Sequence, residues 1–299
     1  MNFAPICLFT YQRLSCTIKT IKALQKNELA NQSDLYIFSD GAADSNSENK
    51  VLEVRKYLDK VNGFKNIYII HQAQNKGLAQ SIIDGVSKII HEQGKVIVIE
   101  DDIVTTPNFL TFINNALTFY ENEHKVFSVG GYTIPIKWPA GGSFDVYFAP
   151  RTTSWGWASW KDRWETVDWN VSDYSSFKDN KSARAAFNLG GSDLSAMLDR
   201  QMNHELDSWM IRWCYQQFKN NQCTVFPTVS KVRNIGFGPD ATHTKFYDRY
   251  RSELDDTNKN EFRFKKEVEF DPLVLKSYQK KYSLQSRITG RIKHYLGLP

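Results

Sequence analysis

The sequence VIVIEDD at residues 96–102 decides the fold class, because four consecutive β-branched residues stand directly before three acidic ones. A short continuous run of this kind is typical of a strand buried on both faces of a parallel sheet. Similar short apolar runs occupy residues 6–9, 35–38 and 67–70. Together the four runs predict the core of an α/β domain.

Helical patterns separate these runs. Apolar residues recur every three or four positions over residues 14–24, 78–89 and 109–116, and the last pattern follows Thr106 as the predicted N-cap and Pro107 at the first helical position. Such alternation predicts a Rossmann-like, mostly parallel sheet with helices on both faces and a ligand site at the carboxyl ends of its strands. Beyond about residue 125 the pattern becomes aromatic, glycine-rich and irregular, and helical periodicity returns over residues 206–218.

Composition excludes several other classes of protein. With 299 residues the chain can bury a large core, and its four cysteines show neither a Cys-x-x-Cys pair nor zinc-ligand spacing. A net charge of +5 with interspersed acids argues against an extended nucleic-acid surface. No basic leader and no run of about 20 apolar residues is present, so we expect a cytoplasmic protein.

The C-terminal end has a charge pattern of its own. Residues 272–299 contain no Asp or Glu, and Leu284, Ile288, Ile292 and Leu296 recur at every fourth position. Two interpretations stay open: a basic amphipathic helix lying on the anionic inner face of a membrane, or a helix that packs its apolar stripe on its own domain. The cations of this region are Lys276, Lys280, Lys281, Arg287, Arg291 and Lys293.

The acidic triplet Glu100-Asp101-Asp102 is the strongest candidate for chemistry. Three carboxylates at the end of a buried strand repel one another, so a compensating cation is the natural explanation. Mg²⁺ or Mn²⁺ suits oxygen ligands and is commonly held by one or two carboxylates together with substrate phosphates. The alternative is a solvated acidic turn before a helix.

Three further loops follow the other predicted strands, and we expect them at the same edge of the sheet. The first reads Thr10-Tyr11-Gln12-Arg13. The second contains Asp40, whose carboxylate could accept hydrogen bonds from a base or ribose. In the third, Asn75-Lys76-Gly77 opens a helix, where the Lys76 ammonium and free N–H groups could meet a phosphate.

These residues resemble those of the GT-A glycosyltransferases, in particular the inverting, metal-dependent N-acetylglucosaminyltransferase I type and bacterial family 2-like sugar transferases. The resemblance covers roughly residues 4–245. Besides the triplet, residues 151–157 (RTTSWGW) look like the Gly-Trp segment of that family, and residues 205–209 (ELDSW) look like its Asp-Asp-Trp segment. It implies a GT-A fold with an irregular acceptor-side subdomain.

The resemblance also implies roles on the donor side. Asp102 would bind Mn²⁺ or Mg²⁺ bridged to the diphosphate, Asp101 would approach the ribose, and Glu100 would support them. Arg13 and Asp40 would lie near the uracil. The remaining candidates for the nucleotide sugar are Thr10, Tyr11, Asn75, Lys76, Gly77, Trp155 and Gly156.

On the acceptor side, the resemblance makes Asp207 the general base that takes the proton of the acceptor hydroxyl. Leu206 stands where a second acid is usual, so Glu205 stays an alternative. Residues 234–243 look like the glycine-containing loop that folds over the donor diphosphate, and His243 would ligate the metal or bond a phosphate oxygen. The tryptophans between residues 155 and 169 are more typical of a core, with only Trp155 or Trp157 at the ligand.

We therefore predict a donor-binding half at residues 1–125, an acceptor-side and catalytic half at 126–250, and a basic helical tail at 251–299. The predicted function is metal-dependent, inverting transfer of a hexose or N-acetylhexosamine from a UDP-sugar to a glycan or lipid-linked glycan, in surface polysaccharide assembly. We expect no nucleic-acid partner. One alternative is a nucleotidyltransferase acting on a sugar phosphate, but the chain has no glycine-rich basic loop after its first predicted strand. The other is a non-catalytic carbohydrate-binding protein, but that function would leave the acidic triplet unexplained.

Overall fold

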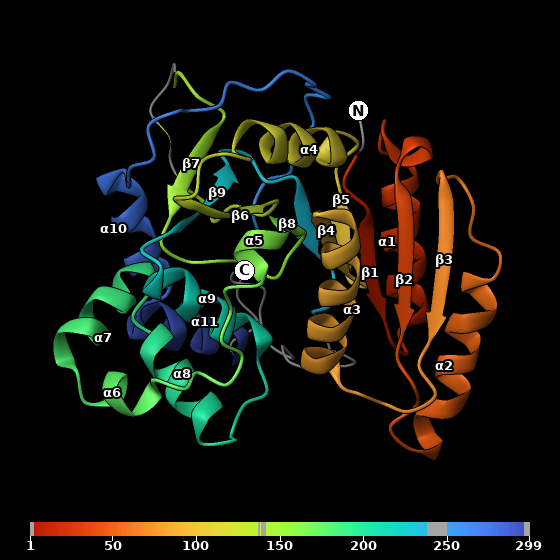
Figure 1. The fold of residues 1–299 in the computed structure, drawn as a ribbon, viewed down its shortest axis with the longest axis horizontal. Coiled ribbons are helices and arrows are strands. Elements are labelled where there is room, and N and C mark those ends of the chain that lie inside the picture. Colours follow the sequence, from red (N-terminus) through yellow and green to blue (C-terminus); the bar gives the residue numbers. More distant parts are fainter. Residues whose placement is uncertain (1–2, 137, 139–141, 238–249, 296–299) are drawn as a thin grey trace.

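The four apolar runs of the N-terminal half form neighbouring parallel strands in the order β3-β2-β1-β4. This computed structural model describes residues 3–136, 138, 142–237 and 250–295. The strands occupy one side of an eight-stranded sheet (Figure 1). Their bounds are β1 Ile6–Thr10, β2 Asp34–Ser39, β3 Asn66–His71 and β4 Lys95–Glu100.

The other half of the sheet is mixed. Strand β8 (Trp157–Trp160) runs antiparallel to β4 and to β6 (Val126–Gly130), which pairs in parallel with β9 (Cys223–Pro227). Strand β7 (Val146–Ala149) closes the edge, and a second small sheet joins β5 (Ile103–Thr105) to β10 (Val232–Asn234). The protein is therefore an α/β fold with a mostly parallel sheet, as predicted.

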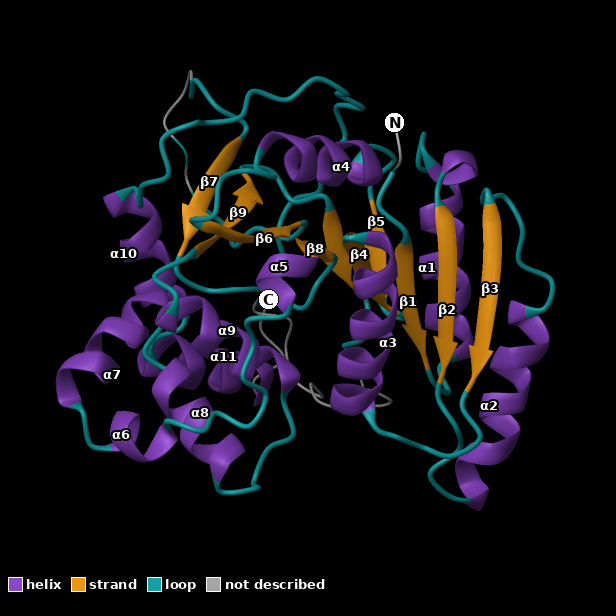
Figure 2. Ribbon diagram, viewed as in Figure 1, coloured by secondary structure: helices purple, strands orange, loops and turns teal. Residues whose placement is uncertain are grey.

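Helices cover both faces of the parallel half. Ile97 and Ile99 of β4 pack in one core, and Val96 and Val98 pack in another. The first core receives α1 (Leu14–Gln25), α2 (Ser45–Leu58) and α4 (Phe109–Phe119), whereas the second receives α3 (Leu78–Gln93). Figure 2 shows α3 in front of the sheet and α1 behind it. This two-sided burial is why the strand carries an uninterrupted apolar run.

Two local expectations were wrong, and one helix was not predicted. Strand β3 is not buried on both faces, because it lies at the sheet edge and leaves Tyr68 45% exposed. Helix α4 has Asn108 as its N-cap, since Thr106 and Pro107 belong to the preceding turn, in which the Phe109 amide donates to the Thr106 carbonyl. Helix α2 was not anticipated, although Asp44 and Ser47 form a capping box at its start.

The predicted irregular subdomain is largely helical and has its own small core. Phe177, Phe187, Leu198 and Tyr215 are buried together in it, and Figure 1 shows α6, α7 and α8 grouped away from the parallel half. Its elements are α5 (Lys161–Trp164), α6 (Tyr174–Lys178), α7 (Lys181–Phe187), the short 3-10 helix Asn188–Gly190, α8 (Leu194–Met202) and α9 (Trp209–Lys219). A further 3-10 turn spans Ala30–Gln32.

The tryptophan cluster is mainly core, as expected. The rings of Trp157 and Trp213 have centroids 4.1 Å apart, and Trp157 also stacks on Trp164 and Trp209. Trp160 is buried on the opposite side. Among the four tryptophans between residues 155 and 164, only Trp155 is partly exposed.

The C-terminal region is not a separate tail throughout. Helix α10 (Pro272–Lys281) buries Val274 and Tyr278 in the main core, and Tyr282 follows them. Helix α11 (Leu284–Tyr295) instead exposes its stripe: Leu284, Ile288 and Ile292 are 61%, 48% and 53% exposed. The described stripe therefore does not pack on its own domain. Leu296 and the side chain of Lys293 lie outside the described part.

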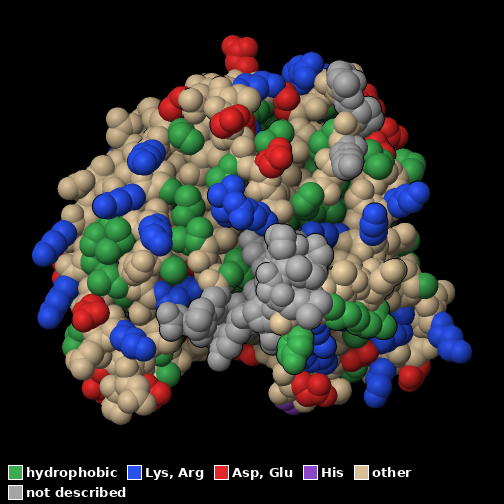
Figure 3. Space-filling model, turned by 180° about the vertical axis from the view of Figure 1, so that it is seen from behind, with side chains coloured by type: hydrophobic (Ala, Val, Ile, Leu, Met, Phe, Trp, Pro, Cys, Tyr) green, Lys and Arg blue, Asp and Glu red, His purple; other side chains and the backbone are tan. Residues whose placement is uncertain are grey.

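Two surface properties complete the fold. Among the helices in the described ranges, none has both the length and the hydropathy needed to cross a bilayer. Figure 3 shows Lys and Arg side chains distributed among acidic and hydrophobic ones on the face that it presents.

Candidate functional site

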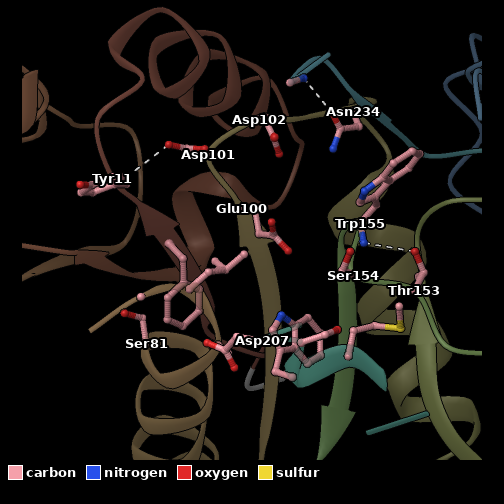
Figure 4. Close-up of a pocket in the computed structure, with 18 of the residues that line it drawn as sticks. Tyr11, Ser81, Glu100, Asp101, Asp102, Thr153, Ser154, Trp155, Asp207 and Asn234 are labelled. Carbon is pink, nitrogen blue, oxygen red and sulfur yellow. Dashed lines mark hydrogen bonds between the residues drawn. The ribbon is translucent and has the colours of Figure 1, made fainter. Parts of the chain in front are cut away.

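A cavity of about 700 Å³ lies where the carboxyl ends of β1, β2 and β4 face the helical subdomain. It brings together most of the residues that the sequence singled out, and Figure 4 shows a part of this lining. The predicted residues among its walls are Thr10, Tyr11, Arg13, Asp40, Asn75, Gly77, Glu100, Asp101, Asp102, Trp155 and Asp207.

Two residues of the acidic triplet, Asp101 and Asp102, are buried and Glu100 is half-buried, which excludes the solvated-turn alternative. Asp101 and Asp102 are 4% and 7% exposed. Nη2 of Arg13 lies 2.5 Å from Oδ1 of Asp101 and 2.8 Å from Oδ2 of Asp102, and the Tyr11 amide donates to Asp101 at 3.4 Å. Arg13 is therefore held by the carboxylates, which differs from the position near a base that the resemblance implied.

The charges at this strand end are not balanced. Burial raises the pKa of Asp101 to about 6; Arg13 opposes this shift and the charge of Asp102 adds to it. Burial also raises the pKa of Glu100 well above its usual range, and the charges of Asp102 and Asp101 add to that rise. One guanidinium thus faces three carboxyl groups in a poorly solvated place.

Asp102 has one carboxylate oxygen that is unpaired. Its Oδ1 is buried and has no hydrogen-bond partner, whereas its Oδ2 pairs with Arg13. Within the described ranges no three His, Cys, Asp or Glu side chains are grouped so as to hold a metal ion. The residues therefore fit an ion that takes one carboxylate oxygen from the protein and further oxygens from a substrate, as Mg²⁺ commonly does.

A loop covers the same carboxylate from the side of β10. The Ile235 amide donates to the Asp102 carbonyl at 2.8 Å, and a Cβ added to Gly236 would lie only 2.0 Å from Oδ2 of Asp102. This close approach requires glycine. The predicted continuation of the loop, with Gly238, Asp240, Thr242 and His243, lies outside the described residues.

Asp40 has a different role from the one predicted. Its Oδ1 accepts hydrogen bonds from the amides of Gly41 and Lys76, both at 2.9 Å, and its Oδ2 accepts from Nδ2 of Asn75 and the Gly77 amide, both at 3.1 Å. Four donors use the capacity of the carboxylate, so it has none for a base or ribose. Asp40 instead holds the loop before α3 in place.

Lys76 does not reach the cavity as predicted. Its Nζ lies 2.8 Å from Asp84 on the outer side of α3, and it is not part of the cavity wall. The backbone of the same loop does line the cavity through Asn75 and Gly77. A helix N-terminus at this point offers free N–H groups to an anion without Lys76.

The two candidate bases are placed differently. The side chain of Asp207 is 71% exposed, lines the cavity and has Arg212 at 3.6 Å. Glu205 is exposed outside the cavity wall, 3.8 Å from Arg200. Figure 4 shows Asp207 on the far side of the cavity from Asp102, with Glu100 between them. Position therefore favours Asp207.

An aromatic group forms the wall beside Asp102. The centroid of the Trp155 ring lies 4.6 Å from that of Tyr132, 5.9 Å from that of Tyr250 and 6.0 Å from that of Phe237. Gly156 is buried behind this group with φ +57° and turns the chain rather than lining the cavity.

The cavity wall also contains a buried ion pair that no sequence pattern indicated. Nη1 and Nη2 of Arg151 bind Asp193 at 2.8 and 3.1 Å, and the guanidinium carbon lies 3.7 Å from the centre of the Tyr282 ring. All three residues line the cavity. Because they come from distant parts of the chain, no local pattern could have joined them.

Comparison with known proteins yields remote structural similarity. No protein-family model and no curated protein matches the chain. One similar solved structure is S. aureus TarS 1-349, with 11% identity and a TM-score of 0.38 over 76% of this chain and 59% of that one. A second is the mannosyltransferase PcManGT from Pyrobaculum calidifontis in complex with GDP-Man and Mn²⁺, with 8% identity and a TM-score of 0.40 over 73% and 71% of the two chains.

A third similar structure is a UDP-glucose pyrophosphorylase complexed with UDP-glucose. Its identity is 15% and its TM-score 0.30, over 55% of this chain and 79% of that one. The chain thus spans less than two thirds of the TarS 1-349 structure, and of a second S. aureus TarS structure it spans 37%. TM-scores of this size do not assign the chain to a family.

Proposed function

We propose that the protein is a metal-dependent glycosyltransferase that moves a sugar from a UDP-sugar to the hydroxyl of a glycan. The observation that carries this proposal is one cavity with two kinds of carboxylate in its walls. Buried, incompletely neutralised Asp101 and Asp102 lie on one side, and exposed Asp207 lies on the other. The first kind suits a cation and the second suits proton transfer.

On the donor side, Oδ1 of Asp102 would hold Mn²⁺ or Mg²⁺ together with oxygens of the donor diphosphate. When bound, the ion neutralises the charge that develops on the departing diphosphate. The first residues of α3, Leu78 and Ala79, also line the cavity, so the free N–H groups of this helix start can meet the diphosphate. Asp101 and Tyr11 are the proposed contacts for ribose and uracil.

On the acceptor side, Asp207 accepts the proton of the incoming hydroxyl as that oxygen attacks the sugar carbon. A single base opposite the leaving group gives direct displacement, so the product has the inverted anomeric configuration. The transferred sugar is a hexose or N-acetylhexosamine, and we place the reaction in surface polysaccharide assembly.

A screen of donors tests the function directly. The protein is incubated with Mn²⁺ and UDP-, GDP- or CMP-sugars, and released nucleotide is measured. We expect UDP release from a UDP-sugar, its loss with EDTA, and an inverted anomer by NMR. Release of no nucleotide overturns the activity, a retained anomer overturns the role of Asp207 in direct displacement, and pyrophosphate release from UTP with a sugar 1-phosphate assigns nucleotidyl transfer instead.

We also propose that α11 contacts an anionic lipid surface, where a lipid-linked acceptor is found. Leu284, Ile288 and Ile292 form an exposed apolar stripe, Arg291 is exposed beside it, and no acid occurs in residues 272–299. Apolar side chains next to cations are suited to an anionic interface, whereas two copies of a cationic face repel each other.

Vesicle sedimentation tests this contact. Wild type is expected to bind vesicles that contain phosphatidylglycerol more strongly than pure phosphatidylcholine vesicles, and Ile288→Ser with Ile292→Ser should remove the difference. Leu52→Ser is the matched control, because Leu52 is 50% exposed on α2. Equal binding to both vesicle types, or a dimer in light scattering that the α11 variant loses, overturns the lipid assignment.

A further inference from the structure

Arg13 occupies the position between the two buried aspartates of the cavity. One of its nitrogens, Nη2, lies within 2.5 Å of Asp101 and 2.8 Å of Asp102, so it bridges carboxylates from neighbouring residues. The side chain of Arg13 is 21% exposed, and those of Asp101 and Asp102 are 6% and 10% exposed. A guanidinium stays charged at all relevant pH values, so this bridge is a permanent positive charge.

The surroundings hold Arg13 at this bridge. The Thr17 amide donates to the Arg13 carbonyl at 2.9 Å as α1 begins, which anchors its backbone. Gly236 lies directly above, since an added Cβ would be 2.8 Å from Nη1 of Arg13 and 2.0 Å from Oδ2 of Asp102. The guanidinium is thus enclosed between a helix start, two carboxylates and a loop.

One oxygen is left over in this arrangement. Oδ1 of Asp101 and Oδ2 of Asp102 accept from Arg13, and Oδ2 of Asp101 accepts from the Tyr11 amide. Oδ1 of Asp102 is buried and has no partner. A buried acceptor without a partner is costly, so this atom is the one that gains most from a bound cation.

From this geometry we infer that Arg13 is a built-in counter-cation that keeps a divalent ion from being chelated by Asp101 and Asp102 together. The ion is restricted to Oδ1 of Asp102 and binds well only when a diphosphate brings more oxygens. Arg13 is in this sense a positioning residue. The inference rests on the proposed function, because it assumes a divalent ion at Asp102.

Two physical effects support this restriction. An ion at Oδ1 of Asp102 lies close to the guanidinium, and like charges repel strongly in a poorly solvated site. A cation that used both aspartates would also have to displace the hydrogen bonds of Arg13, which are charge-assisted and therefore strong. Removing the guanidinium removes both obstacles and frees two carboxylates for the ion.

Mn²⁺ binding without any turnover tests the inference. Free Mn²⁺ is measured by electron paramagnetic resonance with the full chain, in the absence and presence of UDP. Wild type is expected to bind Mn²⁺ weakly alone and at least tenfold more tightly with UDP. Arg13→Gln is expected to bind Mn²⁺ alone at least tenfold more tightly than wild type, and to lose most of the dependence on UDP.

Matched variants separate the bridge from overall charge and from folding. Lys19→Gln removes an exposed cation from α1, the helix that Arg13 precedes, and should bind Mn²⁺ as wild type does. The double variant Arg13→Gln with Asp101→Asn removes one carboxylate as well, so its Mn²⁺ affinity without UDP should return toward that of wild type. This second variant also keeps the charge balance of the site if Arg13→Gln alone folds poorly.

The outcomes distinguish this inference from the proposed function. Equal or weaker Mn²⁺ binding by folded Arg13→Gln without UDP overturns the role of Arg13, while the donor screen still stands. If UDP does not promote Mn²⁺ binding by wild type, the co-binding of ion and diphosphate is overturned. The donor screen then decides separately whether sugar transfer occurs without the ion.

Discussion

Two groups of buried aspartates in this protein differ in how completely they are paired. Asp255 accepts from Lys231 and Asn108 at one oxygen and from the amide and hydroxyl of Thr257 at the other. Asp102 shares Arg13 with Asp101 and leaves Oδ1 without a partner. Both residues are under 10% exposed, so burial alone does not explain the difference.

The pKa values follow the pairing. Burial alone would raise the pKa of Asp255, but hydrogen bonds from Lys231, Thr257 and Asn108 hold it well below its usual range. Burial raises the pKa of Asp101 to about 6, in spite of Arg13. Asp255 is thus fully paired within the fold, whereas the triplet leaves part of its pairing capacity unused.

The largest effect is expected at the unpaired oxygen. Asp102→Ala should abolish Mn²⁺-dependent UDP binding, because it removes the proposed ligand for the ion. The free energy of unfolding should stay the same or rise, since a buried and poorly paired charge is lost. Isothermal titration with and without Mn²⁺, together with urea unfolding, measures both; Mn²⁺-dependent affinity equal to that of wild type contradicts the assignment.

The next largest effect is expected at Asp207, the exposed carboxylate on the other side of the cavity. Asp207→Asn should lower turnover by about 10²–10⁴-fold, the usual contribution of a general base, and leave donor affinity unchanged. Glu205→Gln is the control and should be nearly as active as wild type, since Glu205 is outside the cavity wall. Unchanged turnover in Asp207→Asn removes it from this role, and a loss confined to Glu205→Gln transfers the role.

At the paired site the effect is on stability. Asp255→Ala should lower the free energy of unfolding by about 3–5 kcal/mol, because it leaves Lys231 buried and unpaired. The side chain of Lys231 is only 5% exposed. Adding Lys231→Met should recover part of the loss in urea unfolding. A single-variant cost under about 1 kcal/mol would show that the pair is not structural.

The smallest effect is a difference in pH dependence. The raised pKa of Asp101 means that its burial costs stability above about pH 6, and this cost is relieved as pH falls toward the unfolded value of about 3.9. Wild type should therefore gain on the order of 1–2 kcal/mol relative to Asp101→Asn between about pH 7 and pH 4.5.

The pKa shift of Asp255 has the opposite sign to that of Asp101, so Asp255→Asn serves as the comparison. Because its folded pKa is lowered, its contribution is fully present above about pH 4 and is lost as pH falls through the folded pKa. The gap between wild type and Asp255→Asn should thus stay constant from about pH 7 to pH 4.5. Urea unfolding at both pH values checks this, and parallel behaviour of the two variants contradicts it.

Much of the parallel half was predictable because its sequence patterns are local. β1, β2 and β4 carry apolar runs at residues 6–9, 35–38 and 96–99, and helices α1 and α3 show regular apolar spacing. Helix α2 was missed because charged and polar residues dominate it, and its buried positions are few. The exposure of β3 depends on its place at the edge, which only the strand order reveals.

The site was predictable as a set of loops but less so in its pairings. Asp40 and Asn75 were expected at the cavity and are there, yet Asp40 binds its own loop. Arg13 was expected near a base and instead binds aspartates more than 80 positions away. Arg151 and Asp193, 42 positions apart, form a pair that no motif indicated.

By itself, the sequence determined the alternation of strands and helices and placed a carboxylate triplet at the end of a buried strand, because periodicity and β-branching act over a few residues. The tertiary structure decided which oxygen of that triplet lacks a partner, that Asp207 rather than Glu205 lines the cavity, and that α11 exposes its apolar stripe. These outcomes depend on desolvation and on distances between remote residues, which exist only once the chain is folded.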